Sequence, residues 1–323
     1  MPETSKPTLW ITRKLTANVE ARAARDYDVI LNPEDRPWSS DDLVEMSVKA
    51  DAILPCHSEI FDADVTARLD PRTKIIATHS VGTDHCDLDA LKARGIVVAN
   101  TPDVLSDATA EIAFLLLLGA ARRAAEGDAM VRSGNWSSWS PSFMVGTQVT
   151  GKRIGIIGMG RVGQVMAQRC RGFDMEVHYH NRSRLTQDKE QGAIYHDTLE
   201  GLLPNCDFLS LHCPATPQSN GLVDAGLLAQ LPDGTILVNT ARGALVVEDD
   251  LIAALKSGKL AAAGLDCFVT EPGGNPAISE LTNVFLLPHI GSATFETRDA
   301  MGFRALDNLD AFFSGKEPGD RVA

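Results

Sequence analysis

The stretch that decides the fold is IGIIGMGRVG, residues 154–163, whose three glycines form the pattern G-x-G-x-x-G. An apolar, β-branched run precedes the glycines, a helical pattern covers residues 161–171, and Gly172 follows that pattern. A second strand-like run, MEVHYHNR, comes next at residues 175–182. Strand, glycine turn, helix and strand in this order predict a βαβ unit that binds the pyrophosphate of a dinucleotide.

Each glycine of this pattern has a separate task. Gly158 permits the tight turn, Gly160 lets the backbone approach the pyrophosphate, and Gly163 lets the helix pack close to the strand. The unpaired N–H groups at the helix N-terminus then meet the phosphates. A glycine turn without a ligand is the alternative, and the flanking strand and helix argue against it. The loop residues predicted to contact the cofactor are Gly158, Met159, Gly160, Arg161, Val162 and Gly163.

The end of the second strand bears on which dinucleotide is bound. NAD sites usually carry Asp or Glu there to bind the ribose 2′-hydroxyl. This chain instead has Asn181, Arg182, Ser183 and Arg184. Amide, hydroxyl and guanidinium groups accommodate a 2′-phosphate that a carboxylate would repel. The four residues therefore predict contacts with NADP(H), with NAD(H) as a possible second cofactor; the alternative is that both arginines are ordinary solvated loop charges.

Length and composition agree with an enzyme of two domains. The chain has 323 residues, is 44% hydrophobic and carries a formal net charge of −13, with no basic stripe that would indicate nucleic acid. The polar N-terminus lacks a signal-peptide core, and the longest apolar run, residues 112–121, is too short to span a bilayer. The cysteines have neither metal-site nor disulfide spacing, so we expect no metal, reduced core thiols and a cytoplasmic location. They are Cys56, Cys86, Cys170, Cys206, Cys213 and Cys267.

Short apolar strands alternate with helical segments along most of the chain, which predicts an α/β protein with two doubly wound, Rossmann-like parallel-sheet domains. Between the two series lies a helical stretch that starts near Val104, followed by the aperiodic segment SGNWSSWSPSFMVG at 133–146, which we expect to be a loop or arm. A last helical segment covers 293–315. The expected strands are 8–12, 27–31, 51–54, 74–78, 96–99, 175–180, 207–212, 235–239, 262–266 and 284–287.

Three residues in the second half combine the side chains needed for carbonyl chemistry. Arg242, Glu271 and His289 each follow the C-terminal end of an expected strand, the edge where open parallel sheets bind ligands. Arginine can fork onto a carboxylate, histidine can give or take a proton, and glutamate can orient the imidazole. Each residue alone is commonly a surface or turn residue. Together, downstream of a dinucleotide motif, they predict reduction of a 2-keto acid.

Over nearly its whole length the chain resembles the D-isomer-specific 2-hydroxyacid dehydrogenase family. The resemblance lies in several blocks in the same order: HSVGTDHCDL (79–88), NTPDVLSDATAE (100–111), the glycine pattern, NTARG (239–243), GLDCFVTEP (264–272) and LLPHIGSAT (286–294). The segment W-x-x-W-x-P (136–141) and the NRSR loop (181–184) are most similar to the glyoxylate/hydroxypyruvate reductase branch.

The resemblance implies roles for further residues. Arg242 binds the substrate carboxylate and carbonyl, His289 is the acid/base, and Glu271 is its partner. Backbone groups of Ser80, Val81 and Gly82 hold the substrate carboxylate, and Trp139 reaches the substrate pocket of a neighbouring subunit. Further cofactor contacts are implied at Thr109, Cys213, Pro214, Thr240, Ala241, Asp266, His289 and Gly291.

The resemblance also implies a homodimer with a discontinuous substrate domain. Residues 1–100 and 291–323 form that domain, and 101–290 form the dinucleotide domain, with a dimerisation arm around 104–146. The expected partners are a small 2-keto or 2-hydroxy acid and a second copy of the chain, without nucleic acid or membrane. Two alternatives stay open: a dehydrogenase of another small anion such as formate or phosphite, and a dinucleotide-sensing corepressor-like protein.

Overall fold

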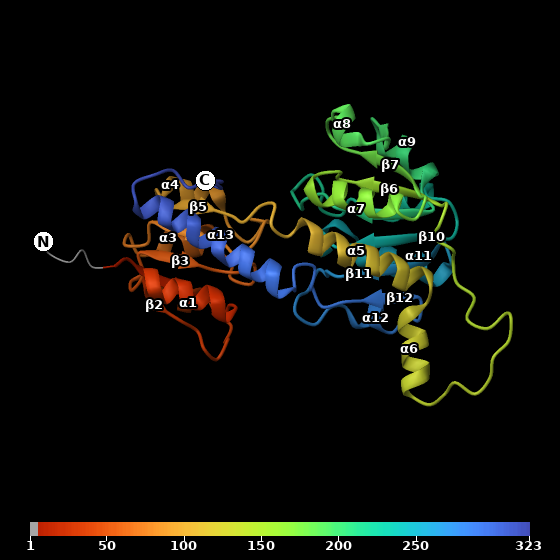
Figure 1. The fold of residues 1–323 in the computed structure, drawn as a ribbon, viewed down its shortest axis with the longest axis horizontal. Helices are drawn as coiled ribbons and strands as arrows, with labels where there is room; N and C mark the ends of the chain where they lie inside the picture. Colours follow the sequence, from red (N-terminus) through yellow and green to blue (C-terminus); the bar gives the residue numbers. More distant parts are fainter. Residues whose placement is uncertain (1–5) are drawn as a thin grey trace, which may run out of the picture. The chain divides into compact units, whose positions relative to one another are not determined.

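A computed structural model describes residues 6–323, which form two compact units: residues 6–105 together with Ser292–Ala323, and Ser106–Gly291. Figure 1 shows a parallel sheet covered by helices in each unit. This confirms the predicted α/β class with two parallel-sheet domains. Within residues 6–323, no helix is both long and apolar enough to cross a membrane.

The smaller unit contains a five-stranded parallel sheet in the order β2-β1-β3-β4-β5. Helices α1 and α13 cover one face through an aliphatic cluster that includes Leu9, Val19 and Leu306, and α2, α3 and α4 cover the other around Trp10 and Phe61. Its elements are β1 Thr8–Ile11, α1 Ala17–Asp26, β2 Asp28–Ile30, α2 Ser40–Ser47, β3 Ala52–Leu54, α3 Ala63–Arg68, β4 Ile75–Ala77, α4 Leu88–Ala93, β5 Val97–Ala99 and α13 Phe295–Phe313.

The larger unit contains a seven-stranded parallel sheet in the order β12-β11-β10-β9-β6-β7-β8. The chain leaves β6 for β7 on one side and later returns to β9 on the other, so the strand order reverses at β6, the position where such sheets bind ligands. Its strands are β6 Arg153–Ile157, β7 Glu176–His180, β8 Ile194–His196, β9 Phe208–Leu211, β10 Thr235–Asn239, β11 Leu260–Leu265 and β12 Val284–Leu286.

Helices cover both faces of this sheet, as near-continuous apolar strands require. Helices α5 and α7 pack on one face around Leu116 and Met166, and α10 and α11 pack on the other around Leu228 and Leu255. The helices are α5 Ser106–Ala121, α6 Ala124–Arg132, α7 Arg161–Arg171, α8 Gln187–Glu190, α9 Leu199–Leu202, α10 Ala225–Gln230, α11 Glu248–Ser257 and α12 Pro276–Ser279, with 3₁₀ turns η1 Leu203–Asn205 and η2 Gly243–Leu245.

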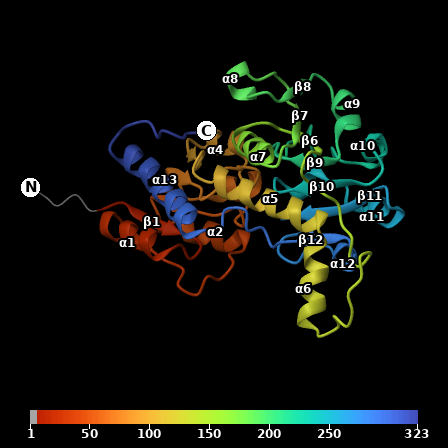
Figure 2. The ribbon, with the colours of Figure 1, turned by 45° about the vertical axis from the view of Figure 1, so that its right-hand side comes forward.

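Helix α6 and the segment after it lie outside this layered core. Figures 1 and 2 show α6 leaving the end of α5 and the chain then running as a long loop before β6. No residue of α6 is buried. Residues 133–146, which we call the arm, contain neither helix nor strand, as predicted.

All six cysteines are free, and four of them are buried as expected. The prediction of core positions was wrong for Cys56 and Cys213, which are only half-buried.

Candidate active site

The three predicted catalytic residues all lie at the carboxyl edge of the larger sheet. Arg242 follows β10, Glu271 lies in the loop after β11, and His289 follows β12. These strands are parallel neighbours, so the segments that leave them emerge side by side. The strand order therefore brings together residues up to 47 positions apart in sequence.

His289 and Glu271 form a close pair. Nδ1 of His289 lies 2.6 Å from Oε2 of Glu271, and the two side chains are 28% and 24% exposed. The other carboxylate oxygen, Oε1, accepts the N–H of Phe268 at 2.7 Å. Glu271 is thus fixed by its own loop while it faces the imidazole, an arrangement that selects the orientation of the ring.

The backbone of His289 has an uncommon conformation that Asp266 supports. Its φ is +53°, in the left-handed region that costs most non-glycine residues free energy. The buried carboxylate of Asp266 accepts the next two N–H groups, from Ile290 at 2.8 Å and Gly291 at 2.7 Å. Burial raises the pKa of Asp266, and the two N–H groups and His289 oppose that shift. Asp266, predicted to face the cofactor, therefore also holds the loop of the candidate acid/base.

Arg242 is positioned by two neighbours that sequence reasoning did not single out. Asn239, buried at the end of β10, accepts the N–H of Ala241 at 2.9 Å and donates to the carbonyl of Arg242 at 2.8 Å. A side chain at Gly243 would place its Cβ 1.9 Å from the carbonyl carbon of Phe268. The signal was present in NTARG, since a buried amide at a strand end and a glycine after the arginine both indicate a tightly built turn.

The glycine loop after β6 has the form that a pyrophosphate requires. Gly158 has φ +93°, and a Cβ there would lie 2.4 Å from the backbone nitrogen of Cys213, which places that predicted cofactor contact beside the loop. A Cβ at Gly163 would lie 2.5 Å from the carbonyl oxygen of Gly158, so the helix and turn pack closely, as predicted. Gly160 begins α7 without a side-chain cap, and an added Cβ would meet nothing within 4 Å.

A buried hydroxyl near the same edge also fits a bound cofactor. Thr240, which follows β10, is 9% exposed, and its Oγ1 has no hydrogen-bond partner within residues 6–323. Buried polar atoms are normally paired, so this hydroxyl is suited to a polar group of a ligand. With the open Gly160 turn, it makes the larger unit a good fit for a dinucleotide.

The four residues predicted at the ribose differ from one another in the structure. Oδ1 of Asn181 accepts the N–H of Met159 at 2.7 Å, so this side chain braces the glycine loop. Arg184 is paired with the buried carboxylate of Glu190 at 2.8 and 3.1 Å, and Glu190 also accepts the hydroxyl of Tyr179 at 2.7 Å. Arg182 and Ser183 are exposed. Within residues 6–323, Arg182 forms no salt bridge, which makes it the guanidinium best able to meet a phosphate.

The other residues predicted to contact the cofactor are buried to different degrees. The side chain of Met159 lies in the hydrophobic core, so this residue can offer only its backbone to a ligand. Thr109, on α5, is buried beside Gly291, whose added Cβ would lie 3.4 Å from the threonine methyl group. Arg161 and Val162 begin α7, and Ala241 and Pro214 follow β10 and β9. None of these positions is remote from the carboxyl edge of the sheet.

The predicted carboxylate-binding loop Ser80–Gly82 belongs to the smaller unit, after β4. The hydroxyl of Ser80 donates to the carbonyl of Gly82 at 2.7 Å, and Asn100 donates to the carbonyl of Val81 at 2.8 Å. The carbonyl of Ser80 accepts the N–H of Thr101 at 2.9 Å. These contacts fix the loop through its carbonyl groups, and within residues 6–323 the N–H groups of Val81 and Gly82 donate no backbone hydrogen bond.

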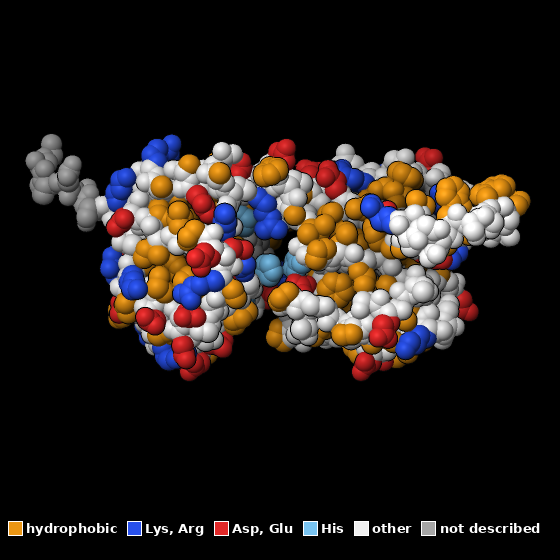
Figure 3. All heavy atoms as spheres, turned by 90° about the horizontal axis from the view of Figure 1, so that it is seen from below, with side chains coloured by type: hydrophobic (Ala, Val, Ile, Leu, Met, Phe, Trp, Pro, Cys, Tyr) orange, Lys and Arg blue, Asp and Glu red, His pale blue; other side chains and the backbone are white. Residues whose placement is uncertain are grey.

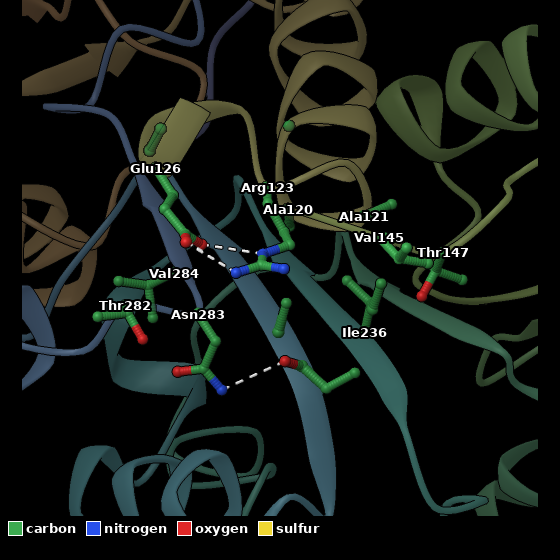
Figure 4. Close-up of a pocket in the computed structure, with 15 residues that line it drawn as sticks. Ala120, Ala121, Arg123, Glu126, Val145, Thr147, Ile236, Thr282, Asn283 and Val284 are labelled. Carbon is green, nitrogen blue, oxygen red and sulfur yellow. Dashed lines mark hydrogen bonds and ion pairs between the residues drawn. The ribbon is translucent and has the colours of Figure 1, made fainter. Parts of the chain in front are cut away.

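A cavity of about 340 Å³ lies away from these residues, at the opposite edge of the larger sheet. Figure 4 shows Arg123 and Glu126 paired on one side of it, with Val145 and Thr147 on another. Ile236, Ala262 and Val284 line it from the amino-terminal halves of β10, β11 and β12. The predicted catalytic residues follow the last residues of the same strands, so this cavity lies at the other end of those strands.

Comparison with known proteins agrees with this geometry. Residues 114–291 match the family model described as D-isomer specific 2-hydroxyacid dehydrogenase, NAD binding domain. The chain is 43% identical to glycerate dehydrogenase of Hyphomicrobium methylovorum, covering 97% of this chain and 98% of the relative. It is 41% identical to glyoxylate reductase of Thermococcus litoralis, covering 98% and 97%.

A solved structure is similar over the same extent. The NADPH-dependent glyoxylate/hydroxypyruvate reductase from Sinorhizobium meliloti, in complex with NADP and malonate, superposes with a TM-score of 0.86 at 32% identity, covering 99% of this chain and 97% of that one. The βαβ cradle, the Arg, Glu and His residues at one sheet edge, and these full-length similarities lead to one conclusion. The chain belongs to the D-isomer-specific 2-hydroxyacid dehydrogenase family, oxidoreductases that use a nicotinamide dinucleotide.

Proposed function

We propose that the protein reduces small 2-keto acids, such as glyoxylate or hydroxypyruvate, to D-2-hydroxy acids. The observation that carries this proposal is the 2.6 Å pair of His289 and Glu271 at the sheet edge that also holds Arg242. The names of relatives at 41–43% identity support the substrate class.

The three side chains divide the work. A bound nicotinamide supplies the hydride that reaches C2 of the keto acid. His289 gives a proton to the carbonyl oxygen; because its Nδ1 faces Glu271, the transferred proton is the one on Nε2. Arg242 binds the carboxylate and polarises the carbonyl through its planar guanidinium. Glu271 keeps the ring oriented and favours its protonated form.

We further assign the amide groups of the loop Ser80–Gly82 to the substrate carboxylate and the smaller unit to substrate binding. The larger unit then binds the dinucleotide. This division is supported by the family model, which matches residues 114–291 as the NAD binding domain.

The proposal includes a preference for NADPH. Its support is chemical: the end of β7 carries no acidic side chain, whereas Arg182 and Ser183 are exposed in the loop that follows β7. The Sinorhizobium meliloti relative is NADPH-dependent.

We also propose that the protein is a homodimer and that the arm contributes to the interface. Trp136 is 57% exposed, Trp139 73% and Val145 64%, which is unusual for large apolar side chains in so short a segment. Figure 3 shows hydrophobic side chains on the surface of the larger unit, including its projecting end. A second copy of the chain would cover them, and Trp139 would then reach the partner's substrate pocket.

The test is steady-state reduction of glyoxylate and hydroxypyruvate across a range of pH. Reduction needs protonated His289, so kcat/KM should fall as pH rises, and oxidation of the product should show the opposite slope. Glu271→Gln removes the charge but keeps a hydrogen-bonding group, so it should move the fall in reduction to lower pH. His289→Ala should abolish most turnover at every pH. If wild type and Glu271→Gln lose activity over the same pH range, the assigned role of Glu271 is wrong.

A further inference from the structure

Glu248, the first residue of α11, holds both ends of the segment that carries Glu271. Its Oε1 accepts the N–H of Val269 at 3.0 Å, and its Oε2 accepts from Nδ2 of Asn275 at 2.8 Å. One contact lies two residues before Glu271 and the other four residues after it. A single carboxylate therefore spans the segment 269–275.

Most of the segment is exposed, whereas α11 is anchored in the core. Residues 269–273 are exposed, and Val269 is 58% exposed. Helix α11 buries Leu251, Ile252, Ala254 and Leu255 in the core of the larger unit. Glu248 thus connects an exposed loop to a rigid helix, which is how a supporting residue fixes the geometry of a reacting group.

The same segment also bears on Arg242. Phe268, the residue before Val269, donates its N–H to Glu271, and its carbonyl carbon lies 1.9 Å from where a Cβ of Gly243 would be. A shift of this segment would therefore disturb the turn that carries Arg242 as well as the carboxylate that faces His289.

We propose that Glu248 is a positioning residue for the reaction, a role that rests on the proposed function of the His289–Glu271 pair. Its carboxylate holds the segment Val269–Asn275 so that Glu271 stays within hydrogen-bond distance of His289. Glu248 acts through hydrogen-bond geometry; its charge is secondary.

The groups that act on His289 directly are different ones. Glu271 faces its Nδ1, and Asp266 interacts with it electrostatically from the end of β11. The buried thiol of Cys267 interacts electrostatically with Glu271, Asp266 and Arg242. A change at Glu248 therefore alters the pH profile of kcat/KM only by displacing these groups.

The experiment compares three variants in the intact protein. Glu248→Gln keeps one acceptor oxygen but replaces the other by an N–H₂ group, which would face the N–H₂ group of Asn275. The Oδ1 atom of Asn275 cannot accept from it, because that atom already accepts the N–H of Ala277 at 3.0 Å. Glu248→Asp keeps the charge but shortens the reach. Asp249→Asn, on the next residue of α11, is the matched control because Asp249 is exposed and its change removes the same charge.

Both Glu248 variants should lower kcat/KM for glyoxylate about tenfold, the effect of losing one hydrogen bond to a charged group. Both should also move the fall in reduction to lower pH, in the direction of Glu271→Gln, while KM for NADPH stays within about twofold. Asp249→Asn should match wild type in every measurement.

Three results would overturn the proposal. One is a pair of Glu248 variants whose pH profiles superimpose on wild type. Another is a uniform loss at all pH values with a raised KM for NADPH, which would indicate a merely structural role. The third is a Glu271→Gln profile that does not move, because the proposed role of the pair then fails and the positioning role fails with it. If Glu271→Gln moves the profile and the Glu248 variants do not, only the role of Glu248 is refuted.

Discussion

Replacing Arg182 by alanine should separate the two cofactors. Arg182 is exposed and, within residues 6–323, forms no salt bridge, whereas Arg184 is bound to Glu190 through two contacts of 2.8 and 3.1 Å. A hydrogen bond to a charged group contributes about 1.5–3 kcal/mol. Arg182→Ala should therefore lower kcat/KM for NADPH about ten- to 150-fold and leave the value for NADH nearly unchanged.

The matched control is the neighbouring arginine. Arg184→Ala alone would leave the buried Glu190 without its cation, so the control pairs it with Glu190→Gln, which keeps an acceptor for Tyr179. This double variant should change the ratio of NADPH to NADH activity less than Arg182→Ala does, because the guanidinium of Arg184 is already bound to Glu190 in the wild-type protein.

A third variant should reverse the preference without disturbing the glycine loop. Asn181→Asp keeps an oxygen for the N–H of Met159 and adds a carboxylate that binds ribose hydroxyls and repels a 2′-phosphate. We expect a shift of about ten- to a hundredfold towards NADH. The assay is kcat/KM for each cofactor at saturating glyoxylate, at fixed ionic strength. Equal wild-type values for NADPH and NADH, or a larger effect from the control than from Arg182→Ala, would refute the reasoning.

Three other measurements test separate parts of the structure. Arg242→Lys loses the planar fork, so kcat/KM for glyoxylate should fall severely while NADPH affinity is retained; a change within about threefold, less than 1 kcal/mol, would contradict the assignment. Burial lowers the pKa of His79 from 6.5 to about 4, so on acidification the unfolded state binds a proton before the folded state does. The smaller unit should therefore lose up to ~3 kcal/mol of folding stability as the pH falls from 6.5 to about 4. His79→Gln should flatten this pH dependence in denaturant unfolding. Trp139→Ala should alter the relative activity towards small and bulky keto acids more than cofactor binding, and light scattering that shows a fully active wild-type monomer would exclude the proposed interface.

The sequence allowed most of the strands to be predicted because they are short apolar runs between turns. Helix α7 begins and ends at the predicted residues, since Gly160 and Gly172 flank a clear helical pattern. Strand β8, Ile194–His196, was not predicted: it has three residues, lies at the sheet edge, and its Ile194 is 42% exposed. So short a strand shows no alternation from which its pairing could be inferred.

The contacts that adjust the site could not be predicted from local patterns. Asn181 occupies the expected acid position, but its bond to Met159 joins residues 22 positions apart. Glu248 is 21 residues from Val269, and Arg184 is six from Glu190, a spacing that neither a helix nor a strand would bring together. Such pairs depend on how loops at the sheet edge are packed, and the left-handed backbone of His289 depends on Asp266 in the same way.

The hydrogen bond between Asp266 and Gly291 lies where the chain passes from one unit to the other. Gly291 is the last residue of the larger unit, and Ser292 is the first residue of the second part of the smaller unit. The N–H of Gly291 is bound to Asp266, and the carbonyl of Ser292 accepts from Nε of Arg298 at 3.2 Å. Adjacent residues are thus hydrogen-bonded to different units. A rotation about this connection would have to occur in the few backbone torsions between Gly291 and Ser292. The two N–H groups that Asp266 binds, those of Ile290 and Gly291, lie along the chain between His289 and this connection.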